Sequence, residues 1–206
     1  MQEIDEDRLF VLRHIMPYVP VRPVPRDLFA GTRYPGVVDV AVCDGQWHTV
    51  AFINWSDDER QPLSFTLDSR LLGQFADKHE RFVVSEFFSG VSVDAVASGQ
   101  TLHLGYIEPH GAALVKIAPD CGEPVVTGST AHFSMGGELE QLCIEHNELR
   151  FSVDHKFDCP VTYTIRLPAG YHVVGQTRQF AVFAGKVVIQ VDERGPFHIR
   201  IPLGQD

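Results

Sequence analysis

Carboxylates and histidines that lie close together in the sequence are the first candidates for chemistry. Asp154 is followed directly by His155, an order that could supply a general base and the carboxylate that orients it. Successive strand residues point to opposite faces, so these two side chains are poorly placed to pair. Glu138 and Glu140 share one face of a predicted strand and could form an acid/base pair, although such pairs more often lie on a solvated outer face.

Metal and nucleophile motifs are the second place to look for chemistry. The ten histidines are scattered along the sequence. His103 and His110 flank a predicted turn, and His146 and His155 lie at neighbouring strand ends. The spacing of these pairs does not demand a metal site. The sequence has no GxGxxG, GxxxxGK[ST], HExxH or GxSxG motif. No CxxC pair occurs among the four cysteines, which are Cys43, Cys121, Cys143 and Cys159. We therefore predict no catalytic residue, no metal site, no cofactor and four independent reduced cysteines.

Exposed aromatic side chains are the most plausible binding feature, because sugar rings stack on the faces of tryptophan and tyrosine. The candidate carbohydrate-binding residues are Trp47, Trp55, Tyr18, Tyr34 and Tyr106. The alternative is that these rings pack in cores and interfaces, since both tryptophans lie on one predicted central strand.

Composition limits the possible partners. The 206 residues carry 17 basic and 27 acidic side chains, a net charge of −10, and 44% of them are hydrophobic. This is ordinary globular composition, and the acidic balance argues against nucleic acids and anionic membranes as partners. The sequence has no apolar run of about 18 residues, and its acidic first residues lack the pattern of a secretory signal. Together with the cysteines, these features favour the cytoplasm.

The elements that must position these residues begin with one amphipathic helix. Ile4, Arg8, Val11 and Ile15 fall on one stripe, which Leu9, Leu12 and Met16 widen. We predict a helix over residues 3–16, ended by Pro17 and Pro20, that needs a surface to pack against. Residues 17–36 contain five prolines and are expected to be an extended, irregular connector.

From residue 37 onward the pattern is almost wholly β. Short apolar runs alternate with turn signals such as Asp44-Gly45 and Pro109-His110-Gly111. The predicted strands are 37–42, 46–55, 63–67, 82–88, 101–107, 112–117, 125–133, 138–146, 148–154, 161–167, 171–174, 179–183, 186–191 and 197–201. We expect an all-β chain of two antiparallel β-sandwich domains in tandem, 17–119 and 123–206, preceded by the helix in 1–16. A single larger sandwich is the alternative.

The predicted strand 46–55 is apolar on both faces. Trp47, Ala51 and Ile53 lie on one face, and Val50 and Phe52 lie on the other. This pattern predicts a central strand whose outer face is also covered, by the helix, the connector or a neighbouring domain.

Several stretches, read in order, resemble one family. They are residues 5–17, 22–29, 47–57, 107–111 and 127–132. The two most specific are Asn54-Trp55-Ser56-Asp57 and Pro109-His110-Gly111. Together they resemble the region C-terminal to the catalytic barrel of melibiase-like α-galactosidases, glycoside hydrolases of clan D and family 36-like. The resemblance covers most of residues 3–135.

The resemblance implies a role without catalysis. It identifies the helix with the last barrel helix and the proline-rich segment with the connector to a β domain. A (β/α)₈ barrel takes roughly 250 residues, and no such barrel is visible in this sequence, so the family's catalytic aspartates have no counterpart here. The implied function is an accessory region that packs on and braces a catalytic barrel in cis; the alternative is a carbohydrate-binding β-sandwich module. A stand-alone small enzyme is a third reading.

Overall fold

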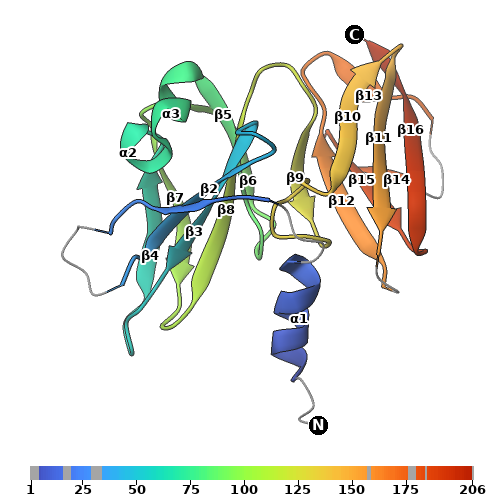
Figure 1. Ribbon diagram of the computed structural model, residues 1–206. Helices are drawn as coiled ribbons and strands as arrows, with labels where there is room; N and C mark the ends of the chain where they lie inside the picture. Colours follow the sequence, from blue (N-terminus) through green and yellow to red (C-terminus); the bar gives the residue numbers. More distant parts are fainter. Residues whose placement is uncertain are drawn as a thin grey trace. The chain divides into compact units, whose positions relative to one another are not determined.

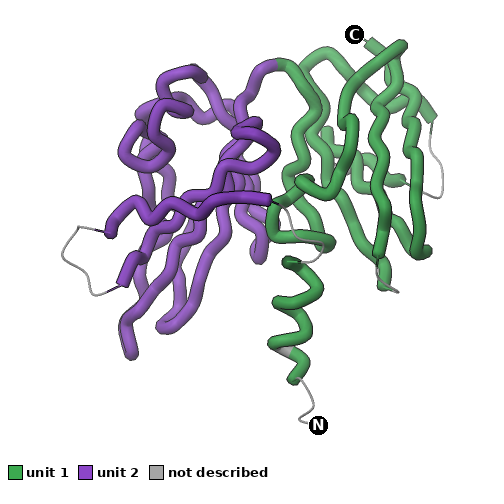
Figure 2. The backbone as a smooth tube through the Cα atoms, in the orientation of Figure 1, with its two compact units in different colours: residues 1–19, 122–206 green, residues 20–121 purple. Residues whose placement is uncertain are grey.

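The computed structural model describes residues 5–15, 20–28, 34–156, 159–175, 180–183 and 185–205. The chain divides into two compact units (Figure 2). Unit 2 comprises residues 20–121, and unit 1 comprises residues 1–19 together with 122–206. The N-terminal helix therefore belongs to the same unit as the C-terminal half of the chain.

Unit 2 is built from two antiparallel sheets and two short helices (Figure 1). Its elements are β1 (Pro23–Pro25), β2 (Val37–Val42), β3 (Trp47–Ile53), β4 (Gln61–Thr66), α2 (Ser69–Leu72), α3 (Gln74–Lys78), β5 (Arg81–Glu86), β6 (Ser92–Ala97), β7 (Thr101–Ile107) and β8 (Ala112–Pro119). Six strands form one sheet in the order β1-β2-β3-β8-β5-β6, and β4 pairs with β7 in a second. The buried core includes Phe52 of β3, Phe65 of β4 and Leu72 of α2.

The described residues of unit 1 form two four-stranded antiparallel sheets and one helix. Its elements are α1 (Glu6–Ile15), β9 (Val125–Ser129), β10 (Leu139–Glu145), β11 (Glu148–His155), β12 (Val161–Arg166), β13 (Tyr171–Val173), β14 (Phe180–Phe183), β15 (Lys186–Val191) and β16 (Gly195–Gln205). The sheet orders are β10-β11-β16-β13 and β14-β15-β12-β9. Leu149, Ile165 and Ile201, which lie on three of these strands, are among the core side chains. The predicted all-β class, with antiparallel sandwiches and one short N-terminal helix, is confirmed.

The helices α2 and α3 were not expected from the sequence. Asp68 caps α2, because its carboxylate accepts hydrogen bonds from the backbone N–H groups of Arg70 and Leu71. Gly73 then adopts a φ of 59° and separates the two helices. The buried Leu72 and Phe75 anchor them to the core.

Strand β3 lies between β2 and β8, which agrees with the prediction of a central strand. Its inner face presents His48, Val50 and Phe52, all buried. On the outer face Thr49 is buried, and Trp47 is half-buried. The Lys116 ammonium of β8 lies 4.1 Å from the centre of the Trp47 ring, a distance that allows a cation–π contact.

Helix α1 is capped at its start and bonded to the body of unit 1 at its end. The Asp5 carboxylate accepts a hydrogen bond of 2.8 Å from the backbone N–H of Arg8. At the other end the backbone N–H of Phe133 donates to the carbonyl of His14 at 2.9 Å. Among the described residues, no helix has the length and apolar character needed to cross a membrane.

Candidate functional site

The two most specific motifs of the sequence meet in space at one corner of unit 2. Asn54, which directly follows β3, is completely buried. Its side-chain amide donates to the carbonyls of Glu59 (2.8 Å), Ile107 (3.0 Å) and Glu108 (3.1 Å), and its side-chain oxygen accepts from Ser56 N–H at 2.9 Å. Asn54 therefore joins the segment after β3 to the turn between β7 and β8. We call residues 54–60 and 107–111 the Asn54 corner.

The glycine of the Pro109-His110-Gly111 turn is required by a close backbone approach. Its N–H donates to the Glu108 carbonyl at 2.9 Å, and its own carbonyl accepts from Asn54 N–H at 2.9 Å. A Cβ atom at Gly111 would lie 2.8 Å from the Glu108 carbonyl oxygen, which is too close for a side chain. His110 has a φ of 54°, a left-handed conformation that the turn imposes.

Charged pairs line the exposed side of the Asn54 corner. Arg60 makes a two-pronged ion pair with Glu108, and His110 lies 3.0 Å from the Asp57 carboxylate. The hydrogen bond from Arg60 lowers the pKa of Glu108, and the same bond raises the pKa of Arg60. Both groups are solvent-exposed, so these pairs contribute little to stability and leave charged groups at the surface.

An aromatic pair adjoins the corner. The rings of Tyr34 and Trp55 lie 5.3 Å apart at 44°; the two residues are 48% and 50% exposed. The indole N–H of Trp55 donates to the Pro35 carbonyl at 2.8 Å, which fixes the orientation of the ring. We call Tyr34 and Trp55 the aromatic pair.

The other predicted aromatic residues lie elsewhere. Trp47 is at the opposite end of β3 from Trp55, and eight residues of extended chain span roughly 26 Å. Tyr106 is 70% exposed on β7, next to Ile107, whose carbonyl accepts from Asn54. Tyr18 lies outside the described residues. Of the five predicted residues, the structure thus shows Tyr34 and Trp55 in ring contact.

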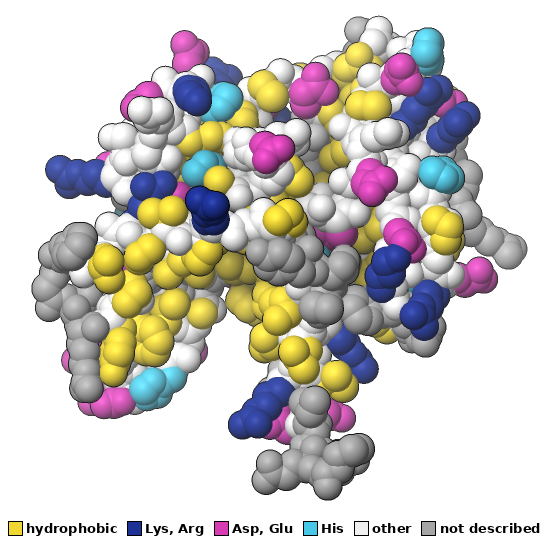
Figure 3. All heavy atoms as spheres, in the orientation of Figure 1, with side chains coloured by type: hydrophobic (Ala, Val, Ile, Leu, Met, Phe, Trp, Pro, Cys, Tyr) yellow, Lys and Arg dark blue, Asp and Glu magenta, His cyan; other side chains and the backbone are white. Residues whose placement is uncertain are grey.

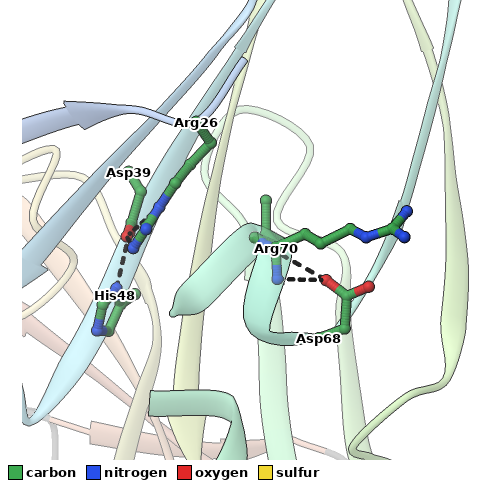
Figure 4. A network of polar contacts seen from close by, with 6 residues as sticks. Arg26, Asp39, His48, Asp68 and Arg70 are labelled. Carbon is green, nitrogen blue, oxygen red and sulfur yellow. Dashed lines mark hydrogen bonds and ion pairs between the residues drawn. The ribbon is translucent and has the colours of Figure 1, made fainter. Parts of the chain in front are cut away.

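A buried polar cluster that the sequence reading missed lies inside unit 2 (Figure 4). Asp39 of β2 is 2% exposed; it accepts from His48 Nδ1 of β3 at 2.7 Å and forms an ion pair with Arg26. The His48 ring also contacts Phe75 of α3, with centroids 4.3 Å apart. Strand alternation was the available signal, because Asp39 and His48 occupy core-facing positions beside Val50.

This cluster ties the chain after β1 to the sheet. Arg26 follows β1, and its guanidinium reaches across to Asp39. The described residues contain no group of three or more histidine, cysteine, aspartate or glutamate side chains arranged to hold a metal ion. We interpret the cluster as a structural attachment.

The carboxylates considered for acid/base chemistry have structural partners. Glu138 accepts from Ser129 Oγ at 3.0 Å, Ser134 Oγ at 3.1 Å and Gly136 N–H at 3.1 Å, and so closes the loop before β10. Glu140 is exposed on the following strand.

Asp154 and His155 engage different partners. Asp154 forms an ion pair with Lys156, and His155 Nε2 donates to the Cys159 carbonyl at 2.7 Å. None of the four cysteines, all of which lie in described parts of the chain, forms a disulfide.

Helix α1 has two distinct faces. Glu6, Leu9, Phe10, Arg13 and His14 line a cavity against the body of unit 1. At about 100° per residue, Val11, Leu12 and Ile15 fall on the opposite face, and they are 47%, 41% and 42% exposed. We call these three residues the outer face of α1. Figure 3 shows hydrophobic side chains exposed along this helix.

Comparison with known proteins adds no family to these observations. No protein-family model matches the chain, and no curated protein matches it.

Proposed function

We propose that this chain is a non-catalytic accessory β region of an α-galactosidase-like glycoside hydrolase, which packs on and braces a catalytic (β/α)₈ barrel. The observation that carries the proposal is the outer face of α1. A helix with apolar side chains on two opposite sides has a second face available for a partner. One side of α1, which includes Leu9 and the 44% exposed Phe10, faces unit 1, and the three large side chains of the other side are exposed.

The size of this face suits a partner in the same polypeptide. Full burial of one large aliphatic side chain contributes roughly 1.5–3 kcal/mol, and the three side chains are already about half covered. Together they would contribute roughly 3 kcal/mol, too little to hold two separate proteins at low concentration. Covalent linkage raises the effective concentration of the partner to the millimolar range, at which such a surface suffices.

The buried carboxylates of the described residues support a role without catalysis. Retaining glycosidases need two carboxyl groups about 5–5.5 Å apart in a site open to substrate. Asp39 is engaged by Arg26 and His48. Glu86 accepts from the backbone N–H groups of Ser89 and Leu114. These partners account for both side chains as parts of the fold.

A sedimentation experiment tests the proposed docking. The chain, at low millimolar concentration, would be mixed with a melibiase-like α-galactosidase barrel that lacks its own β region. We expect a one-to-one complex that weakens at least about tenfold in Val11→Asp and Ile15→Asp, because burying an unpaired carboxylate costs well over 1.4 kcal/mol. Val182→Asp is the matched control, since Val182 is 45% exposed on β14. Equal binding by all variants, or no complex with the parent chain, would contradict the proposal.

A carbohydrate-binding module is the second candidate, and the aromatic pair favours it. Two half-exposed rings, one fixed by a hydrogen bond to Pro35, offer a surface on which a sugar ring can stack. In a Trp47→Phe variant the only remaining tryptophan is Trp55, so its fluorescence would report binding of millimolar methyl α-galactoside. We expect a saturable change that disappears in Tyr34→Ala. A flat titration would reject this candidate.

We also propose a cytoplasmic location. The four cysteines, which form no disulfide among the described residues, support it.

A further inference from the structure

Helix α1 buries none of its described residues. Leu9 and His14 are half-buried and the others are exposed, among them Phe10 at 44% and Leu12 at 41%. A helix of ten residues is marginal in water by itself, and in proteins the packing of an apolar face supplies most of the stability of a helix. Helix α1 therefore has little packing to keep it folded.

The helix is joined to the body of unit 1 at its C-terminal end. The His14 ring stacks on Phe133, with centroids 5.3 Å apart and planes at 21°, and the His14 carbonyl accepts from Phe133 N–H at 2.9 Å. Along the inner side, a cavity of about 520 Å³ lies between the helix and the body of unit 1, lined in part by Glu6, Leu9 and Thr130. The inner side of α1 is thus only loosely packed.

The loop that receives α1 is held by contacts of its own. Met135 is completely buried, and its N–H donates to the His132 carbonyl at 3.0 Å. The Glu138 carboxylate accepts from Ser134 Oγ and from Gly136 N–H. The loop therefore has the means to keep its shape when α1 is not in place.

We propose that α1 is a latch, which opens from unit 1 and unfolds in one step while the sheets of unit 1 stay folded. Local opening costs less than global unfolding where few apolar contacts are buried. Opening separates His14 from Phe133 and removes the outer face of α1 as a preformed surface. A partner that covers the outer face would bind the closed form alone and would hold the latch shut. The equilibrium belongs to the chain by itself, so its test does not depend on the proposed docking to a barrel.

Amide hydrogen exchange of the whole chain, followed by NMR, provides the test. Two amides report the latch: Leu9 N–H donates to the Asp5 carbonyl at 3.0 Å within α1, and Phe133 N–H donates to the His14 carbonyl. Where the opening equilibrium governs exchange, we expect both amides to show the same protection factor. It should be at least about 100-fold below that of the slowest amides of β12, which pairs with a strand on each side. Protection of both amides equal to that of β12 would overturn the proposal.

A variant at the first turn of α1 tests whether the helix opens as one unit. Asp5→Ala removes the carboxylate that accepts from Arg8 N–H at 2.8 Å and caps the helix. A typical cap contributes about 1 kcal/mol, so exchange of Phe133 N–H should accelerate about fivefold, although Asp5 lies at the opposite end of the helix. Exchange of Met135 N–H should stay the same. Glu193→Ala, at an exposed acidic position of unit 1, is the matched control and should change neither amide.

A variant on the outer face separates unfolding of α1 from the departure of an intact helix. Val11 is 47% exposed, and alanine forms helix more readily than valine. If α1 unfolds as it opens, Val11→Ala favours the closed form and slows exchange of Phe133 N–H about twofold. A helix that left unit 1 intact would show no such slowing. Unchanged exchange of Phe133 N–H in either Val11→Ala or Asp5→Ala would overturn the proposal.

Discussion

Asn54 shows how a residue that looks functional in the sequence can serve the fold. Its neighbour Trp55 is half-exposed, whereas Asn54 is buried and makes four side-chain hydrogen bonds. The motif in the segment after β3 and the motif in the turn after β7 are therefore two halves of one structural corner. Their joint presence reflects the need to satisfy backbone carbonyls in a buried place.

Replacing Asn54 with alanine should destabilise unit 2 by about 2 kcal/mol or more. The buried Ile107 carbonyl and the part-buried Glu59 carbonyl lose the donor that Asn54 provides, and each unsatisfied buried group costs about 1–3 kcal/mol. The Glu108 carbonyl keeps its hydrogen bond from Gly111 N–H. Urea unfolding followed by tryptophan fluorescence measures the effect, since Trp47 and Trp55 both lie in unit 2. Gln61→Ala, at an exposed position of β4, is the control and should change stability little. A loss below about 1 kcal/mol in Asn54→Ala would contradict the role assigned to this residue.

His79 supplies a pH-dependent contribution to stability. Burial lowers its pKa below 6.5, and the charge of Lys78 lowers it further; its ring packs edge-on against Phe75 and Phe82. The unfolded chain then binds the proton more tightly than the folded one, so stability is present above pH 6.5 and declines as the pH falls toward the lowered pKa.

We expect the free energy of unfolding of the parent chain to decrease more steeply between about pH 6.5 and pH 5 than that of a His79→Gln variant. His146→Gln is the control, because the His146 side chain is 78% exposed. The measurement is denaturant unfolding at a series of pH values. Identical pH profiles for the parent chain and His79→Gln would show that His79 does not carry this dependence.

At the scale of elements, the sequence predicted the strands better than the helices. The apolar runs Val37–Val42, Thr101–Ile107 and Lys186–Val191 reproduced the observed bounds, because turn residues bound each short run. Strand β6 was missed because Ala95 has a φ of 55° and lies within a register shift that breaks the alternation. Strand β1 was missed because it contains two prolines, which are tolerated only at a sheet edge.

The binding features were less predictable than the strands. The aromatic residues could be identified by type, but their grouping could not, since contact between Tyr34 and Trp55 requires the connector to fold back on the end of β3. The cavity beneath α1 joins residues more than a hundred positions apart. The helical period of the sequence identifies the apolar faces of α1, but it does not indicate which of these faces lies toward unit 1.

The attachment of β1 depends on the Arg26–Asp39–His48 cluster. In Asp39→Asn the side-chain volume is kept and the charge is lost, which leaves Arg26 without its ion pair. We expect unit 2 to lose about 3 kcal/mol or more, as when one partner of a buried pair is removed. The Arg26 amide, which donates to the Val37 carbonyl at 2.9 Å, should exchange with deuterium faster than in the parent chain.

Asp44→Asn is the matched control for this variant. Asp44 lies in the β2–β3 turn with a φ of 56°, a conformation that asparagine adopts readily. It should leave both the stability of unit 2 and the exchange of the Arg26 amide unchanged. Unchanged exchange in Asp39→Asn itself would show that the cluster does not secure β1.

At the scale of the whole molecule, the two units have separate cores and should respond separately to core substitutions. Ile165 is completely buried in unit 1, and Ile165→Ala should cost about 2–5 kcal/mol there. Circular dichroism reports the unfolding of both units, whereas tryptophan fluorescence reports the unfolding of unit 2. We expect Ile165→Ala to lower the unfolding midpoint of a circular dichroism transition and to leave the tryptophan fluorescence midpoint unchanged. A shift of both signals by the same amount would show that the chain unfolds as one cooperative body.

We propose that this chain contributes to a glycoside hydrolase without being one. The most direct test of this proposal is the hydrolysis of p-nitrophenyl α-galactoside. It would be measured for the chain alone, for a melibiase-like barrel that lacks its β region, and for their mixture. We predict no turnover by the chain alone. The activity of the mixture should withstand heating better than the activity of the barrel alone. This gain in heat resistance should be lost when the chain carries Ile15→Asp. Turnover by the chain alone that is abolished by Glu138→Gln or Glu140→Gln would contradict the account.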